Sequence, residues 1–419
     1  MDAPSPANLT PPPLPGRLST SPVAVPALIL GILAVVFSPL LIGIVPGVAG
    51  LILAILHLRR NRQQRRLAWW GGGLAVTGTI LGIVWGGVLI AAVLRFVRPF
   101  NETGSPTARA DLAAADARAS YREAGVLADK GATKARVLSC FCLDREDNIL
   151  ACDEEGKCVR VITPDNALRA TWPVDFWPQA IACRDDGSVI VAGTGRVALL
   201  DAGGQVQAVG SLPQPPGRAA AAGDVAAAAR RRYESAVTAV AALGDDILAC
   251  GRANTGYTIY RLNGRLEGAT PIVKGLTGCG GQMDMTTRDG IIYVAANCDS
   301  KVLKYDRDGK KLGGLGRTGK GIETCFDGCC EPKNVAFGPD GSLYVAGSGT
   351  CSVSRYSADG QFLDYVGRVN GITGCVRVTV AVNRDASRVY MLDTDRHAIR
   401  VLARREPVPA ATPTGAAPP

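Results

Sequence analysis

Histidine is almost missing from this sequence. The 419 residues include only His57 and His397. Metal centres built from several imidazoles are therefore excluded, and any nucleophile that needs a histidine base would depend on His397. We expect His397 to be an ordinary surface residue at the start of a strand, so histidine-dependent catalysis is not predicted.

Acidic residues are equally scarce at one end of the chain. Asp2 is the only acid among the first hundred residues, against eight of the 46 Lys and Arg, so most of the net charge of +9 belongs to this segment. The rest of the chain is close to neutral. A nucleic-acid partner is not expected, because such a protein concentrates its basic excess on the folded domain.

Charge is absent from two long stretches, residues 26–58 and 67–94. About 20 apolar residues span a bilayer as a helix. After a Pro-rich, disordered N-terminus (residues 1–25), the sequence therefore predicts a membrane domain of two transmembrane helices (residues 26–100). The first stretch contains Pro39 and Pro46 and is long enough to require a tilt, a kink or a re-entrant path.

Five arginines lie between the two stretches, from Arg59 to Arg66. Positive residues favour the cytoplasmic side, so this connector is predicted to be cytoplasmic and the chain beyond residue 100 extracytoplasmic. The protein is then a multi-pass cell-membrane protein with the bilayer as a partner. Gly78, Gly82 and Gly86 share one helix face, which would pack against the first helix or form a homodimer.

The leader resembles a bacterial two-helix membrane domain, DUF4190. The matching residues are Ala27–Phe37, Leu58–Arg66 and Gly71–Gly87. The resemblance implies placement in a bacterial membrane and no chemistry. Residues 101–135, which follow, are polar and Ala-rich, and we interpret them as a linker or stalk with a short helix near residues 113–119.

A pattern recurs six times after residue 136. Each unit has a turn, a short apolar run, a second turn and a strand with alternating apolar residues, and successive runs start 40 to 58 residues apart. The runs begin at Ile149, Val189, Ile247, Ile292, Leu343 and Val389. Alternation with Asp-Gly turns is typical of antiparallel strands, and four strands in about 45 residues is the unit of a β-propeller blade.

The unit Pro332–Ala346 (PKNVAFGPDGSLYVA) resembles an NHL repeat. The fold class predicted is therefore an all-β, six-bladed NHL-like β-propeller over residues 136–404, with a disordered tail at 405–419. The sixth unit lacks an obvious fourth strand, and we predict that residues between about Glu123 and Arg136 supply it and close the ring.

All thirteen cysteines lie between Cys140 and Cys375. Ten map to one face of the predicted propeller, at the ends of strands or in the links between blades. At least two structural disulfides are expected in an extracytoplasmic domain, with Cys152 and Cys158 as one candidate pair across a hairpin. A thiolate metal site and reduced, buried thiols are the alternatives.

The predicted function is binding of a ligand or protein partner, as a sensor or scaffold, on the propeller face that carries the Cys-rich links. The residues assigned to this face are Cys279, Cys325, Cys329, Cys330, Glu331, Asn334 and Cys375. No cofactor and no metal are expected. The glycine-rich residues 314–321 do not form a phosphate loop, because Gly follows Lys320 and no helix pattern comes after it.

The alternative function is enzymatic. Six-bladed relatives similar to gluconolactonase or strictosidine synthase hold a divalent ion in the central channel with Glu, Asn and Asp. The resemblance implies Glu331, Asn334 and Asp284 as the residues that could do so here. A hard cation needs about six oxygen ligands, so converging carboxylates and amides in the channel would distinguish an enzyme from a binding module.

Overall fold

The computed structural model describes residues 113–213, 233–253, 256–278, 282–316, 331–371 and 376–406, together with short helical stretches between residues 51 and 88. The chain forms two compact units, residues 1–102 and 103–419. In the first unit the described residues are helical. The described part of the chain contains no helix with the length and apolar character that a membrane crossing requires.

The predicted transmembrane spans (26–58 and 67–94) lie largely outside the described residues, as do Gly78, Gly82 and Gly86. The Pro-rich start (1–25) and the tail from residue 407 also fall outside them.

The second unit consists of six four-stranded antiparallel sheets, as the repeat predicts. The first blade contains β2 (Leu138–Leu143), β3 (Ile149–Asp153), β4 (Cys158–Ile162) and β5 (Leu168–Pro173). The second contains β6 (Ala180–Cys183), β7 (Val189–Gly193), β8 (Arg196–Leu200) and β9 (Val206–Ser211). The third contains β10 (Val237–Leu243), β11 (Asp246–Ala253), β12 (Gly256–Leu262) and β13 (Thr270–Leu276).

The remaining blades follow the same order. The fourth contains β14 (Asp284–Arg288), β15 (Ile291–Ala296), β16 (Lys301–Tyr305) and β17 (Lys311–Leu315). The fifth contains β18 (Asn334–Phe337), β19 (Leu343–Ala346), β20 (Ser352–Tyr356) and β21 (Phe362–Arg368). The sixth contains β22 (Val380–Val382), β23 (Arg388–Asp393), β24 (Ala398–Arg404) and the early strand β1 (Tyr121–Leu127). All six predicted apolar runs fall on the second strand of a blade.

Neighbouring residues determine the turns between the strands. Gly341 has a φ of +80°, a conformation that favours glycine. The preceding side chain, Asp340, accepts a hydrogen bond from the backbone N–H of Ser342 (3.0 Å). Asp186 does the same for Ser188 (2.9 Å) in the second blade. The Asp-Gly pairs are therefore turn formers, as expected from their sequence.

Apolar side chains from neighbouring blades form the core. Each blade interface has its own buried cluster; between the first and second blades it includes Leu150, Val159 and Val191, none of which is measurably exposed. A single blade exposes two apolar faces, so stacking six around an axis is what buries both faces of each sheet.

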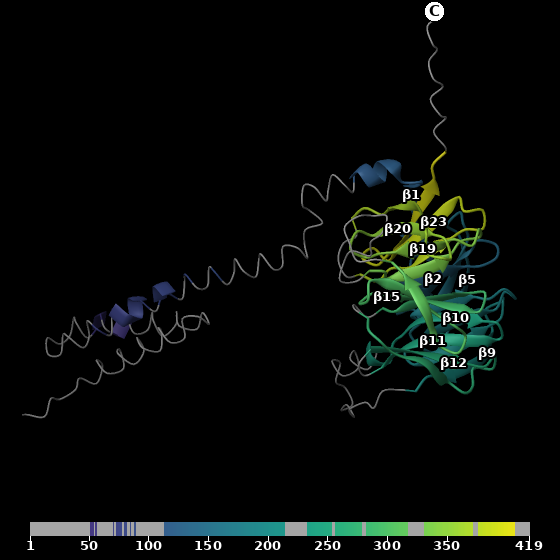
Figure 1. The fold of residues 1–419 in the computed structure, drawn as a ribbon, viewed down its shortest axis with the longest axis horizontal. Coiled ribbons are helices and arrows are strands. Elements are labelled where there is room, and N and C mark those ends of the chain that lie inside the picture. The colour runs from purple at the N-terminus through teal and green to yellow at the C-terminus, as the bar shows by residue number, and fades with distance from the viewer. Residues whose placement is uncertain are drawn as a thin grey trace, which may run out of the picture. The chain divides into compact units, whose positions relative to one another are not determined.

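The ring closes by strand exchange between the two ends of the domain, as predicted. β1 pairs antiparallel with β24, with Glu123 opposite Leu402, and this blue strand lies beside the yellow C-terminal strands in Figure 1. The closing strand begins at Tyr121 and ends at Leu127, earlier than the predicted range. Tyr121 is 1% exposed and its hydroxyl donates to the carbonyl of Ala386 (2.5 Å).

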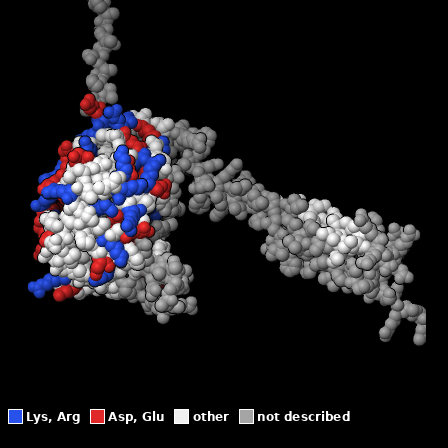
Figure 2. Space-filling view, turned by 180° about the vertical axis from the view of Figure 1, so that it is seen from behind, with Lys and Arg blue, Asp and Glu red and all other residues white. Residues whose placement is uncertain are grey.

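Part of the predicted linker belongs to the propeller rather than to a free stalk. Residues 113–118 form the expected short helix, but Ala115 and Ala119 are buried against Tyr365 of the fifth blade. Asp116 forms an ion pair with Arg368 (2.9 Å). Ala115 and Ala119, four residues apart, form a narrow apolar contact, which the sequence interpretation assigned to a spacer. The face of the propeller seen in Figure 2 carries Lys and Arg interspersed with Asp and Glu.

Candidate functional site: the central channel

The innermost strands of the six blades surround a central cavity. β2, β6, β10, β14, β18 and β22 contact one another in a closed ring, and all six contribute to the lining of a cavity of about 420 Å³. Each is the edge strand of its sheet, so backbone N–H and C=O groups that no neighbouring strand pairs with face the axis. The channel therefore offers hydrogen-bonding groups of its own.

Hydrogen bonds between blades hold the mouth of this channel, the end at which the inner strands begin. The Gln282 side-chain amide donates to the carbonyl of Val378 (2.6 Å) and accepts from its N–H (3.0 Å). This contact ties the fourth blade to the sixth. The Thr238 hydroxyl donates to the carbonyl of Met283 (2.6 Å) and joins the third blade to the fourth. Side-chain hydrogen bonds thus link the blades to one another at the mouth of the channel.

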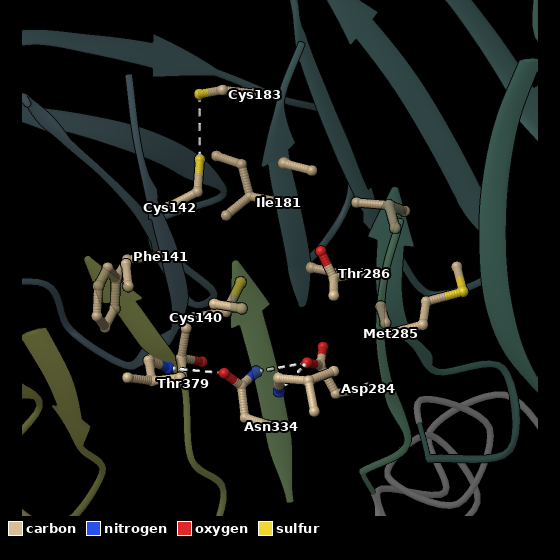
Figure 3. A pocket seen from close by; sticks show the side chains of 18 of the residues that line it. Cys140, Phe141, Cys142, Ile181, Cys183, Asp284, Met285, Thr286, Asn334 and Thr379 are labelled. Atoms are coloured by element: carbon tan, nitrogen blue, oxygen red, sulfur yellow. Dashed lines mark hydrogen bonds between the residues drawn. The ribbon is translucent and has the colours of Figure 1, made fainter. Parts of the chain in front are cut away.

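Asp284 and Asn334 form a polar pair in the channel wall near the mouth (Figure 3). The Asn334 amide donates to Asp284 Oδ2 (2.7 Å), which also accepts the backbone N–H of Val335 (3.0 Å). Asn334 Oδ1 accepts the N–H of Val380 (2.8 Å). Burial raises the pKa of Asp284 to about 7 despite these donors. Near neutral pH the carboxyl is therefore both protonated and ionised in comparable amounts.

Arg377 reaches across the mouth from the sixth blade. It precedes β22, and its Nη2 donates to the carbonyl of Gln179 at the start of the second blade (2.7 Å). Its Nε is buried and has no hydrogen-bond partner. Among the described residues no Asp or Glu forms an ion pair with it. Arg377 thus brings to the channel a cation that no carboxylate of the described residues pairs with.

The charge of Arg377 affects the pKa values of groups in three other blades. Burial raises the pKa of Asp284, Cys152 and Tyr257, and the positive charge of Arg377 opposes the rise at all three. These groups come from the fourth, first and third blades. Arg377 itself lines the channel cavity, and its charge therefore lies within reach of groups from three other blades, since Coulomb interactions weaken with distance.

The far end of the channel carries thiols. Cys142 of β2 and Cys183 of β6 both line the cavity. Their sulfur atoms lie 3.3 Å apart and point toward one another, at the opposite side of the pocket from Asp284 (Figure 3). Burial, followed by the contact with Cys183, raises the pKa of the Cys142 thiol well above its usual value. The channel thus has a cationic mouth and a sulfur-lined far end.

The structure places one of the predicted site residues in the channel and another outside it. Asn334 lines the channel, but Glu331 does not. Glu331 is 6% exposed, and its carboxylate accepts the N–H of Gly349 (2.9 Å) in the loop after β19. The predicted cysteines of the linking segments lie outside the described residues; they are Cys279, Cys325, Cys329, Cys330 and Cys375.

The predicted Cys152–Cys158 disulfide is not present, because both residues are free thiols. Residues directly opposite in a ladder share a face of the sheet, and here Cys158 lies opposite Asp153 while Cys152 lies opposite Val159. Side chains alternate along a strand, so Cys152 and Cys158 project from opposite faces. The two cysteines are close in sequence across a hairpin, but that closeness does not show that their pairing is offset by one residue.

The described residues do not assemble the ligands of a divalent cation. Among the described residues, no three His, Cys, Asp or Glu side chains gather in a way that could hold a metal ion. Of the three residues considered for the enzymatic alternative, Asp284 and Asn334 are hydrogen-bonded to each other and Glu331 is engaged in another loop. A hard cation would need several further oxygen ligands.

Sequence reasoning missed Arg377, Cys142 and Cys183. All three fall at the ends of inner strands: Arg377 just before β22, Cys142 and Cys183 in the last two residues of β2 and β6. Aligning the inner strands of the six units, rather than the second strands, would have shown that these positions border the axis.

Comparisons with known proteins give no family. No family model matches the sequence, so the resemblances to NHL repeats and DUF4190 find no support there, and no curated protein matches it either. Solved structures with a similar fold include a protein of unknown function from Bacteroides thetaiotaomicron, with 16% identity, a TM-score of 0.49, and coverage of 68% of this chain and 74% of that one.

Two further structures are similar in fold. Virginiamycin B lyase from Staphylococcus aureus has 12% identity, a TM-score of 0.43, and coverage of 64% of this chain and 80% of that one. A gluconolactonase from Xanthomonas campestris has 14% identity, a TM-score of 0.45, and coverage of 65% and 87%. Likeness at this level says nothing of activity. The fold of this chain is established by its own sheet order: it is a six-bladed β-propeller.

Proposed function

We propose that the propeller is a ligand-binding module whose central channel takes a small molecule through an anionic group, with Arg377 as the anchor. We further propose that residues 26–100 hold the module in the cell membrane, with the propeller on the extracytoplasmic side. The observation that carries the first proposal is the cation of Arg377 in the channel, which no carboxylate of the described residues neutralises.

A partly buried guanidinium is expensive to leave without an anionic partner. Arg377 has one hydrogen bond from Nη2 to a carbonyl oxygen and an unsatisfied Nε. A carboxylate or phosphate group in the 420 Å³ cavity would supply the missing negative charge. Arg is suited to such groups because its planar fork donates two parallel hydrogen bonds.

Asp284 would tune this binding. In its neutral form it does not repel an anion, and burial already favours that form up to about pH 7, where its pKa lies. The charge of Arg377 favours the ionised form of Asp284. Once an anion pairs with Arg377, this charge is neutralised and no longer favours ionisation of Asp284. Affinity for an anion is therefore expected to fall as pH rises through about 7.

Binding is favoured over the enzymatic alternative by how the polar side chains are used. The amides of Gln282 and Asn334 are both committed to contacts within the wall. Among the described residues that line the cavity, Asp284 is the only carboxylate at the mouth, since Asp185 belongs to the turn after β6. One carboxyl and one cation suit recognition of a polar group better than assembly of a metal site.

The membrane placement rests on the sequence pattern of the leader. Two charge-free stretches flank an arginine-rich connector, and this pattern orients the connector toward the cytoplasm. Protease added to intact spheroplasts should then digest the propeller. Protection of the propeller in spheroplasts, with digestion only in inverted vesicles, would reverse the orientation.

Calorimetric titration of the purified full chain in detergent with benzoate, acetate and inorganic phosphate tests the anion proposal. We expect at least one of these anions to bind, and binding to weaken at least about tenfold in an Arg377→Gln variant, because a hydrogen bond to a charged group contributes roughly 1.5–3 kcal/mol. Arg265→Gln is the matched control, since Arg265 is an exposed turn residue. Equal affinity in all three proteins would contradict the proposal.

A further inference from the structure

The thiol pair at the far end of the channel joins two blades. Cys142 lies near the end of β2 in the first blade and Cys183 at the end of β6 in the second. Their sulfur atoms are 3.3 Å apart. A disulfide bond is about 2.05 Å long, so the two atoms need to approach by a little over 1 Å to bond.

Little in the fold resists this approach. β2 and β6 are edge strands of different sheets, so no ladder hydrogen bond joins them or has to break. The two side chains already point toward one another (Figure 3). The other close thiols, Cys140 and Cys152, differ in that both are buried and face each other across the strands of a single sheet.

Reagents can also reach the pair. Both thiols are only partly buried and line the channel cavity. Cys183 additionally lines a second cavity of about 510 Å³, which lies between the first two blades and includes Leu150 and Trp172. Cys183 is therefore the more accessible of the two thiols and the one that attacks an external disulfide first.

We propose that Cys142 and Cys183 form a redox modification site, which a low-molecular-weight disulfide converts into a covalent link between the first and second blades. The link removes both thiols from the channel wall and fixes the far ends of two inner strands to each other. This inference does not depend on the proposed anion site, which lies at the opposite side of the pocket.

The reaction proceeds by two thiol–disulfide exchanges. The Cys183 thiolate attacks one sulfur of the external disulfide, forms a mixed disulfide and releases the first small thiol, which takes up the proton that Cys183 lost. The Cys142 thiolate then attacks the Cys183 sulfur, and the second small thiol leaves with the proton from Cys142. The two cysteines lose two electrons and two protons, and the external disulfide is reduced to two thiols.

Peptide mapping tests this proposal on the intact chain. The reduced protein is incubated with hydroxyethyl disulfide, its remaining thiols are blocked with N-ethylmaleimide, and it is digested with trypsin. Cys142 lies in the tryptic peptide 137–145 and Cys183 in the peptide 170–184. We expect these two peptides joined as the main cross-linked product, and separated again by dithiothreitol.

Cys140 provides the matched control because it lies in the same peptide as Cys142. The link should persist in Cys140→Ala and disappear in Cys142→Ala. The wild-type protein denatured in guanidinium before oxidation shows what random pairing gives. The proposal is overturned if the folded wild type yields peptide 170–184 only as a mixed disulfide or a blocked thiol, or if Cys142→Ala forms the link through Cys140.

Discussion

An Asp284→Asn substitution should remove a large part of the pH dependence of propeller stability between pH 4 and pH 8. Burial raises the pKa of this carboxyl from 3.8 to about 7. The native state therefore holds the proton more tightly than the unfolded state does, and the stability that this group contributes is fully present below about pH 4. It is lost as pH rises through about 7.

The size of the effect follows from the shift. Three pKa units correspond to about 4 kcal/mol, and we expect about 2–4 kcal/mol because the side chain borders a cavity. The substituted amide would keep an acceptor oxygen for the two donors to Asp284 Oδ2, the Asn334 amide and the Val335 N–H. The variant should thus match the wild type near pH 4 and exceed its free energy of unfolding by that amount at pH 8.

Urea unfolding at pH 5, 6, 7 and 8, followed by tryptophan fluorescence, measures this difference; Trp172 and Trp177 lie in the propeller. Other titrating groups cancel in the comparison because both proteins contain them. Arg377 and the Cys250 thiol, which interact with Asp284 electrostatically, also stay unchanged. A difference between variant and wild type that stays constant within about 0.5 kcal/mol from pH 5 to 8 would refute a carboxyl with a raised pKa.

Three further outcomes are expected. Tyr121→Ala should lower the free energy of unfolding by about 3–5 kcal/mol in urea titrations, because a 1% exposed aromatic ring of the closing strand is lost. Gly193→Ala should cost about 1–3 kcal/mol, since its Cβ would overlap the carbonyl oxygen of Trp177, whereas Gly125→Ala has open space and should stay within about 0.5 kcal/mol. Closure of the Cys142 disulfide should accelerate by up to about tenfold per pH unit between pH 7 and 9 in timed peptide mapping, because burial raises the pKa of its thiol and only the thiolate reacts.

The propeller could be predicted because its repeat is local. The predicted runs that begin at Val189 and Leu343 coincide with β7 and β19, since alternation and Asp-Gly turns are properties of neighbouring residues. Even the closure by an early strand followed from counting strands in the sixth unit. Its start at Tyr121 did not, because that position is fixed by pairing with a strand far away in the sequence, at Arg404.

The site was harder to predict because it depends on contacts between blades. Asn334 and Asp284 were considered together with Glu331 as ligands of a divalent ion, and only the three-dimensional arrangement shows that the Asn334 amide donates to the Asp284 carboxyl. Arg377 acts by reaching past the first blade to Gln179, a distance that no spacing in the sequence encodes. Cys152 lies near the end of β3 and Cys158 at the start of β4, as the sequence predicts, but whether the two side chains share a face depends on the register of the ladder.

The most direct test of an anion-binding channel is a bromide soak of propeller crystals, with the bromide sites located by anomalous scattering. We predict a well-occupied bromide in the central cavity in contact with the Arg377 guanidinium, and its loss in the Arg377→Gln variant. Bromide found only at exposed arginines such as Arg265, with none in the channel, would contradict the proposed function.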